Sequence, residues 1–252
     1  MKEGEIMQTF YLTDTGKVRE HNEDNVIILN NEKDEYILAV ADGMGGHKAG
    51  EVASAIVINH LTEEFYGLET LGTKENAIDW LRNIVTEMNQ KIFDYTKENP
   101  DSKGMGTTFV CAIKTKDYLL YGNIGDSSGY VIKNHKLHKV TKDHTLVNLL
   151  VSTGELTPEE AKYHPRKNVL MRALGANNPI DIDIFDVEPK ISGILLCSDG
   201  LTSMLTDDQI EKVLAEEENA EDALSKLIHK ANARGGNDNI SVAYLKKESG
   251  DL

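Results

Sequence analysis

Residues 36–46 have the sequence YILAVADGMGG, an apolar run that ends at Asp42 and Gly43. The same arrangement occurs in residues 193–200, GILLCSDG, where Asp199 and Gly200 follow the run. Short apolar runs that end at a turn signal are typical of strands buried on both faces. The two stretches therefore predict buried strands, each with an aspartate at its end.

Further strands are expected around this pair, at 25–29, 107–113, 118–124, 129–132 and 239–245. Helices are expected at 51–65, 76–97, 207–216 and 221–232, because apolar residues recur there at helical spacing. Strands and helices do not alternate regularly, as they would around a parallel sheet. The order predicts an α+β fold, mainly antiparallel sheet with helices packed outside.

The chain has 252 residues and no linker, repeat or low-complexity tract, so we expect a single domain over residues 1–252. Residues 143–172 are polar and irregular and contain a helix start at Thr157-Pro158. Such a segment predicts a mobile flap at about 143–172.

Lys and Arg number 27 against 42 Asp and Glu, a net charge of −15. This charge disfavours binding to nucleic acid or to an anionic membrane. The first ten residues lack a signal-peptide pattern, and no apolar run is long enough to cross a bilayer. Cys111 and Cys197 are expected to be buried in a reducing compartment. We therefore expect a cytoplasmic protein, and in the absence of an oligomerisation signal a monomer.

Two more aspartates stand at strand ends. Asp126 follows the run 119–125, and Asp238 precedes the run 240–242. Any one of them could belong to an ordinary turn. If the strand ends converge, however, each pair of like charges at about 4 Å costs ~1 kcal/mol in water and ~4 kcal/mol at an effective dielectric of 20. Divalent cations remove this cost, and all-oxygen ligands suit Mg²⁺ or Mn²⁺.

Residues 19–24, REHNED, form a second charged group. Arg19 can hold a phosphate through two parallel hydrogen bonds, and Glu23 and Asp24 adjoin the strand at 25–29. The alternative for this group is a charged surface loop.

These residues together resemble the metal-dependent type 2C protein serine/threonine phosphatases, the PPM family. The matching stretches are TDTG at 13–16, REHNED at 19–24, VADGMGGH at 40–47, GMGTT at 104–108, IGDS at 124–127, LCSDGLT at 196–202 and GGNDNI at 235–240. They occur in the family's order over nearly the whole chain. Met44 and the stretch DHTLV at 143–147 resemble the bacterial branch, which reverses serine/threonine kinase signalling.

The resemblance implies a four-layer α-β-β-α sandwich, with two antiparallel sheets and a helix pair on each outer face. It also implies roles for the site residues, with Mn²⁺ or Mg²⁺ as cofactor. Asp42 would bridge two ions, Asp199 and Asp238 would complete the first site, and the Gly43 carbonyl would bind the second. Glu23 and Asp24 would support the centre, Asp126 with Asp199 would hold a third ion, and Arg19 would bind the phosphoryl oxygens.

The implied reaction is hydrolysis of phosphoserine or phosphothreonine in phosphorylated proteins, among them a cognate Ser/Thr kinase. A hydroxide shared by two metal ions would attack phosphorus directly. Two positions depart from the family pattern. Met44 stands where some members have a histidine as candidate general acid, so another group, such as a water on the third ion, would have to protonate the leaving oxygen. Ser128 replaces an arginine near Asp126, which removes a fixed positive charge from the third site.

Two alternatives remain at this point. One is a catalytically silent module that binds a phosphoprotein, and the other is a two-metal hydrolase of different phosphate esters, such as nucleotides. The intact Arg19, Asp42, Asp199 and Asp238 disfavour the first. The absence of a nucleotide-binding loop motif disfavours the second.

Overall fold

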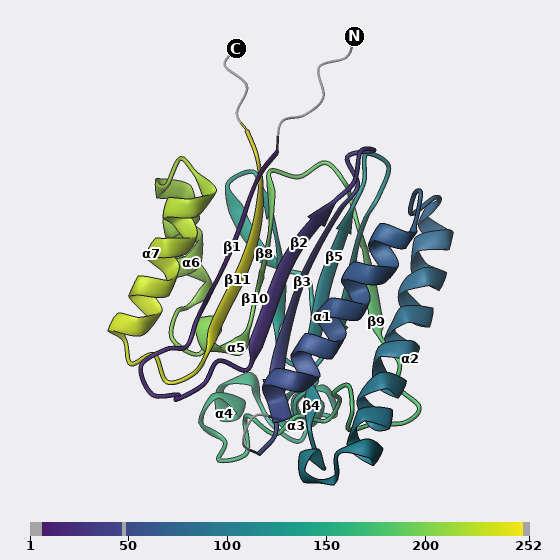
Figure 1. Ribbon diagram of the computed structural model, residues 1–252. Helices are drawn as coiled ribbons and strands as arrows, with labels where there is room; N and C mark the ends of the chain where they lie inside the picture. The colour runs from purple at the N-terminus through teal and green to yellow at the C-terminus, as the bar shows by residue number, and fades with distance from the viewer. Residues whose placement is uncertain (1–6, 47–48, 249–252) are drawn as a thin grey trace.

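The computed structural model describes residues 7–46 and 49–248. Residues 47–48, which include the last residue of one quoted motif, lie outside the described part, as do most of the N-terminal residues searched for a signal peptide. The described chain forms two stacked antiparallel sheets with helices on both outer faces (Figure 1). This confirms the expected α+β class.

One sheet has five strands in the order β1-β11-β10-β7-β8. Their bounds are β1 Met7–Asp14, β7 Ser128–Lys133, β8 Lys136–Lys139, β10 Gly193–Cys197 and β11 Ile240–Lys247. The other sheet has the order β2-β3-β5-β6-β9, with the short β4 paired to β3. Its strands are β2 Asp24–Asn30, β3 Tyr36–Met44, β4 Gly106–Thr107, β5 Phe109–Lys114, β6 Leu119–Ile124 and β9 Asp183–Val187.

Helices cover both sheets, so that the molecule has four layers (Figure 1). The β2–β9 sheet is covered by α1 (Ala49–Gly67) and α2 (Lys74–Glu98), and η1 (Pro100–Ser102) follows α2. The five-stranded sheet is covered by α6 (Asp207–Glu216) and α7 (Ala220–Ala233), with the short α5 (Asp199–Thr202) before them. Within the described chain no helix combines the length and the apolar character that crossing a bilayer requires.

Three apolar clusters hold the layers together. The first lies between α1, α2 and their sheet and includes Leu61, Leu81 and Phe109. The second lies between the two sheets and includes Val40 and Leu196. The third lies under α6 and α7. The strands predicted within 36–46 and 193–200 are thus buried on both faces, because each sheet lies between the other sheet and a helix pair.

The helix boundaries follow from capping residues. Thr73 and Asn76 form a reciprocal capping box at the start of α2, and Thr206 and Gln209 form another at the start of α6. Asn219 caps α7 through the backbone N–H of Asp222. These caps place each helix within a few residues of its predicted position.

The segment between β8 and β9 contains α3 (Leu146–Ser152) and α4 (Pro158–Tyr163). It lies at the lower end of the molecule in Figure 1, beside β4 and opposite the start of β1. Its backbone closes on itself through a bridge between Thr145 and Leu170, and Thr107 pairs with Leu174 just beyond it. The predicted flap range 143–172 therefore corresponds to a distinct helical segment at one end of the sandwich.

Candidate metal centre

Strands of both sheets end at the same edge of the sandwich and bring the acidic residues together there. Asp42 lies near the end of β3, and Glu23 directly precedes β2. The two strands pair in a register that sets Asp24 opposite Asp42. From the other sheet, Asp199 follows β10 and Asp238 precedes β11. The cluster therefore lies at the seam between the two sheets.

A cavity of about 490 Å³ opens at this edge. Its lining contains all but one of the residues predicted for the site: Arg19, Glu23, Asp42, Gly43, Asp126, Asp199 and Asp238. Asp24 is the exception, because it is only 5% exposed and lies behind the lining, where its Oδ2 accepts a 2.7 Å hydrogen bond from Ser198 Oγ. The structure thus brings the predicted residues together, with Asp24 in the supporting layer.

Glycines permit the backbone contacts that form this edge. A Cβ at position 43 would lie 2.2 Å from the carbonyl oxygen of Gly50, at the start of α1. A Cβ at position 200 would lie 1.9 Å from the carbonyl oxygen of Asn239. Each glycine lets two segments approach more closely than any side chain would allow, and the second contact brings Asp199 and Asp238 to the same wall.

The backbone of Asp42 is fixed by Thr108, which lies between β4 and β5. The Asp42 N–H donates to Thr108 Oγ1 at 3.0 Å, and the Asp42 carbonyl accepts from the Thr108 N–H at 2.9 Å. Thr108 Oγ1 also lies 2.7 Å from Ser127 Oγ, next to Asp126. The predicted strand 107–113 is therefore two strands, because Thr108 leaves the ladder to fix the Asp42 backbone.

The cavity carries a concentrated negative charge that burial makes costly. Burial raises the pKa of Asp42 well above its usual value, and the neighbouring aspartates raise it further. Burial, and then the charge of Asp199, raise the pKa of Asp126 to about 7. Burial likewise raises the pKa of Asp199, with Asp238 adding to the shift. A divalent cation between these carboxylates would stabilise their ionised forms and so oppose the upward pKa shifts.

Arg19 supplies positive charge at this site. Its Nη2 donates to Asp238 Oδ2 at 2.8 Å, and the arginine side chain is 49% exposed. A guanidinium that is exposed beside an acidic cavity is available to an incoming phosphoryl group. Residues 19–24 are therefore not simply a charged surface loop, since Arg19 and Glu23 both line the cavity.

The donor set fits Mn²⁺ or Mg²⁺, because every predicted ligand is a carboxylate or carbonyl oxygen. Within residues 7–46 and 49–248, no three of these carboxylates bring oxygens within 4.8 Å of one another. The carboxylates therefore line the cavity without closing on one point.

Three residues of the site were not predicted from the sequence. Asn239 joins the loops, because its Oδ1 accepts from the Glu23 N–H and its Nδ2 donates to the carbonyls of Thr15 and His21, each at 2.9 Å. Thr108 and Arg172 also line the cavity. Asn239 and Thr108 fall inside the quoted motifs, but nothing in the local sequence indicates that their side chains bond to residues so far away.

Comparison with known proteins agrees with this geometry. Residues 16–241 match the family model described as protein phosphatase 2C. The serine/threonine phosphatase stp of Listeria monocytogenes is 41% identical over 243 residues, which cover 96% of each chain. The structure of the Streptococcus agalactiae serine/threonine phosphatase superposes with a TM-score of 0.91 at 35% identity, over 96% of this chain and all (100%) of that one.

A further solved structure contains metal. It is the catalytic domain of the serine/threonine protein phosphatase PstP in complex with two manganese ions, with a TM-score of 0.82 at 34% identity over 97% of this chain and 100% of that one. The family match covers most of the chain, and the alignment with the Listeria phosphatase covers 96% of that protein. The chain belongs to the protein phosphatase 2C family and is a serine/threonine phosphoprotein phosphatase.

Proposed function

We propose that the protein hydrolyses phosphoserine and phosphothreonine in proteins with two core Mn²⁺ or Mg²⁺ ions at the cavity edge, and with room for a third. Asp42, Asp199, Asp238 and the Gly43 carbonyl would hold the core pair, with Glu23 and Asp24 behind them and Asp126 beside the third position. When bound, the ions would lower the pKa of water toward neutrality, so that it can act as the nucleophile toward phosphorus without a covalent enzyme intermediate, and would offset the charge of the phosphoryl oxygens.

The protein's own residues provide position and charge. Arg19 would turn from Asp238 toward the phosphoryl oxygens of the substrate, since it is half-exposed and, among the described residues, its guanidinium forms one hydrogen bond. The loops that carry Arg19, Glu23 and Asp238 are tied together by Asn239. Met44 lines the same cavity but carries no proton to donate, so the leaving oxygen would take its proton from water.

The observation that carries the proposal is the single cavity in which carboxylates from both sheets meet an arginine. The cavity is also lined by Met171 and Arg172, the last two residues of the segment 143–172. We therefore propose that this segment is a flap that shapes access for the phosphoprotein. We further propose that the protein is a cytoplasmic monomer that opposes a Ser/Thr kinase.

The test is phosphate release from a phosphothreonine peptide while Mn²⁺ is titrated in. We expect turnover only with metal, and its loss in Asp42→Asn and Asp199→Asn, whereas Asp101→Asn, an exposed carboxylate in η1, serves as a matched control. Full turnover by Asp42→Asn would end the proposal. Peptide binding without phosphate release in the unmodified protein would favour the silent-module alternative instead.

A further inference from the structure

His144, at the start of the segment 143–172, bonds to the turn that carries Asp126. Its Nδ1 accepts a hydrogen bond from the Gly125 N–H at 3.1 Å, and its own N–H donates to the Gly125 carbonyl at 2.8 Å. The His144 side chain is 10% exposed and lines a pocket of about 680 Å³, which adjoins the carboxylate cavity along Met171 and Arg172. His144 therefore holds the residue next to Asp126 from outside the cavity.

The turn at Gly125 needs a partner of this kind. Gly125 has a φ of +106°, a conformation that glycine permits but does not fix. Its N–H and its carbonyl belong to the two peptide groups on either side of its Cα, so the two bonds to His144 together set the direction in which the chain enters Asp126. The carbonyl also accepts from Asn123 Nδ2 at 3.2 Å. The side chain of His144 therefore matters most at the Gly125 N–H.

The second ring nitrogen fixes the tautomer of His144. Because the Gly125 N–H donates to Nδ1, that nitrogen carries no proton, and the neutral imidazole carries its proton on Nε2. Nε2 donates to Asp183 Oδ2 at 3.2 Å, and Arg172 Nη1 donates to Asp183 Oδ1 at 2.6 Å. Burial lowers the pKa of His144 despite the opposing effect of Asp183, which agrees with a neutral ring. Asp183, on β9, thus keeps the acceptor nitrogen aimed at Gly125.

The backbone of His144 is itself held in place. The Met171 N–H donates to the His144 carbonyl at 2.8 Å, which closes the segment 143–172 on its own start. Asn123 Nδ2 donates to the Lys142 carbonyl at 2.9 Å, which attaches that start to the end of β6. A residue that is fixed on both sides can in turn fix the turn that it contacts.

We propose that His144 is a positioning residue, which acts through Gly125 to orient Asp126 toward the third metal position. The proposal rests on the proposed function, which sets Asp126 beside that position. A carboxylate that is already oriented loses less freedom when it binds a cation. Groups that orient a metal ligand typically account for about 10–100-fold in metal affinity.

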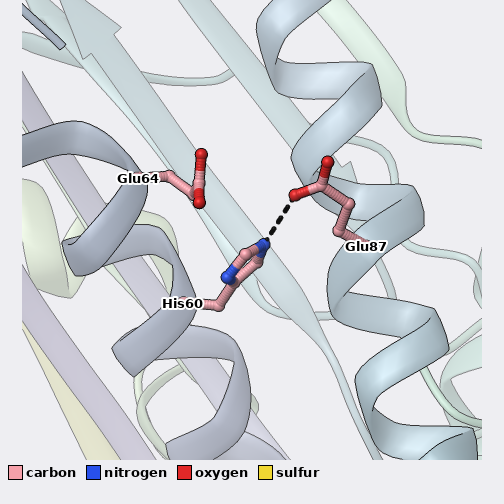
Figure 2. Close-up of side chains that lie close together, drawn as sticks. All are labelled: His60, Glu64 and Glu87. Atoms are coloured by element: carbon pink, nitrogen blue, oxygen red, sulfur yellow. Dashed lines mark hydrogen bonds and ion pairs between the residues drawn. The ribbon is translucent and has the colours of Figure 1, made fainter. Parts of the chain in front are cut away.

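A second buried histidine of the chain provides a matched control. His60, on α1, is 6% exposed, and its Nε2 lies 2.9 Å from Glu87 Oε2 on α2 (Figure 2). It resembles His144 in its burial and in its carboxylate partner, but this contact joins two helices instead of a turn at the cavity. Replacing His60 should therefore lower the stability of the protein and leave metal binding unchanged.

Two substitutions separate the two nitrogens of His144. Asparagine places its Oδ1 where histidine has Nδ1 and keeps the acceptor for Gly125, whereas glutamine reaches the position of Nε2 and keeps only the contact with Asp183. In the Mg²⁺ form of the full chain, we expect the Gly125 N–H to exchange with solvent about tenfold faster in His144→Gln than in His144→Asn or His60→Gln. Equal exchange rates in the two His144 variants, measured by NMR, would overturn the proposal.

Calorimetric titration with Mn²⁺ tests the effect on the metal. We expect His144→Gln to weaken the most weakly bound of three ions about tenfold, with His144→Asn and His60→Gln within about twofold of the unmodified protein. In an Asp126→Asn background, His144→Gln should cause no further loss, because it acts through that carboxylate.

Three results would refute this role: a further loss in the Asp126→Asn background, unchanged Mn²⁺ binding in His144→Gln, or only two ions bound by the unmodified protein. Calorimetry and hydrogen exchange need no substrate. Failure of the proposed function, seen as absent phosphate release from the unmodified protein with Mn²⁺, is therefore told apart from failure of this proposal.

Discussion

Replacing Gly43 by alanine tests the close approach on which the proposed metal centre depends. The added Cβ would lie 2.2 Å from the Gly50 carbonyl oxygen and 2.5 Å from that of Glu23. An ordinary contact needs about 3.5 Å, so the end of β3 and the start of α1 must separate by about 1 Å. Both contacts are backbone atoms that cannot swing away, so we take the upper end of overpacking costs, about 3 kcal/mol of unfolding free energy.

The same displacement should affect turnover, because Asp42 adjoins Gly43 and a misplacement of about 1 Å costs on the order of 100-fold in rate. Gly46→Ala is the matched control, since no described atom lies within 4 Å of its added Cβ. Urea unfolding gives the stability of both variants, and phosphate release with saturating Mn²⁺ gives the rate. If Gly43→Ala matched Gly46→Ala in both measurements, the close approach would have no role in the site.

Three further predictions concern the site and the scaffold. Asn239→Ala removes three hydrogen bonds and should cost roughly 2–3 kcal/mol of stability together with most of the turnover; unchanged turnover would show that the loops align without it. Mn²⁺ at 100 times its Kd should add about 2.7 kcal/mol to the stability of the unmodified protein and much less to that of Asp42→Asn, so equal gains by calorimetry would place the metal elsewhere. Burial alone would raise the pKa of Glu35, but hydrogen bonds from Leu71, Thr70 and Asn31 outweigh burial and lower it, so its stabilisation is present above about pH 4.5 and is lost as the pH falls further. Glu35→Gln should therefore destabilise the protein at pH 7 and lose that difference near pH 3, unlike the exposed Glu32→Gln, and a difference that is the same at both pH values would contradict this.

The central strands and all four outer helices could be predicted from the sequence because their apolar patterns are continuous. Three strands could not. β1 has an alternating pattern of partly exposed residues and pairs with β11, more than 200 positions away. β8 and β9 are edge strands with hardly a buried residue. A strand that buries only one face, at the edge of a sheet, has too few apolar residues to stand out locally.

The candidate site shows the same division. Asp42 and Asp199 could be proposed because each follows a continuous apolar run, and because several aspartates share that position at strand ends. Asn239 and the contacts of His144 could not, since their significance lies in bonds to distant segments. A histidine in a polar segment has the same sequence pattern whether it is exposed or bonded, and only the positions of Gly125 and Asp183 distinguish these cases.

The position of the metal centre links catalysis to the stacking of the sheets. Glu23, Asp24 and Asp42 come from one sheet, and Asp199 and Asp238 adjoin strands of the other. Direct hydrogen bonds join the sheets at this edge, among them Ser198 to Asp24 and Asn239 to Glu23. The like charges on the two sides repel each other. This repulsion opposes the apolar packing that holds the two sheets together. Cations placed between the carboxylates would turn that repulsion into attraction, so the ions needed for chemistry would also close the seam that holds them.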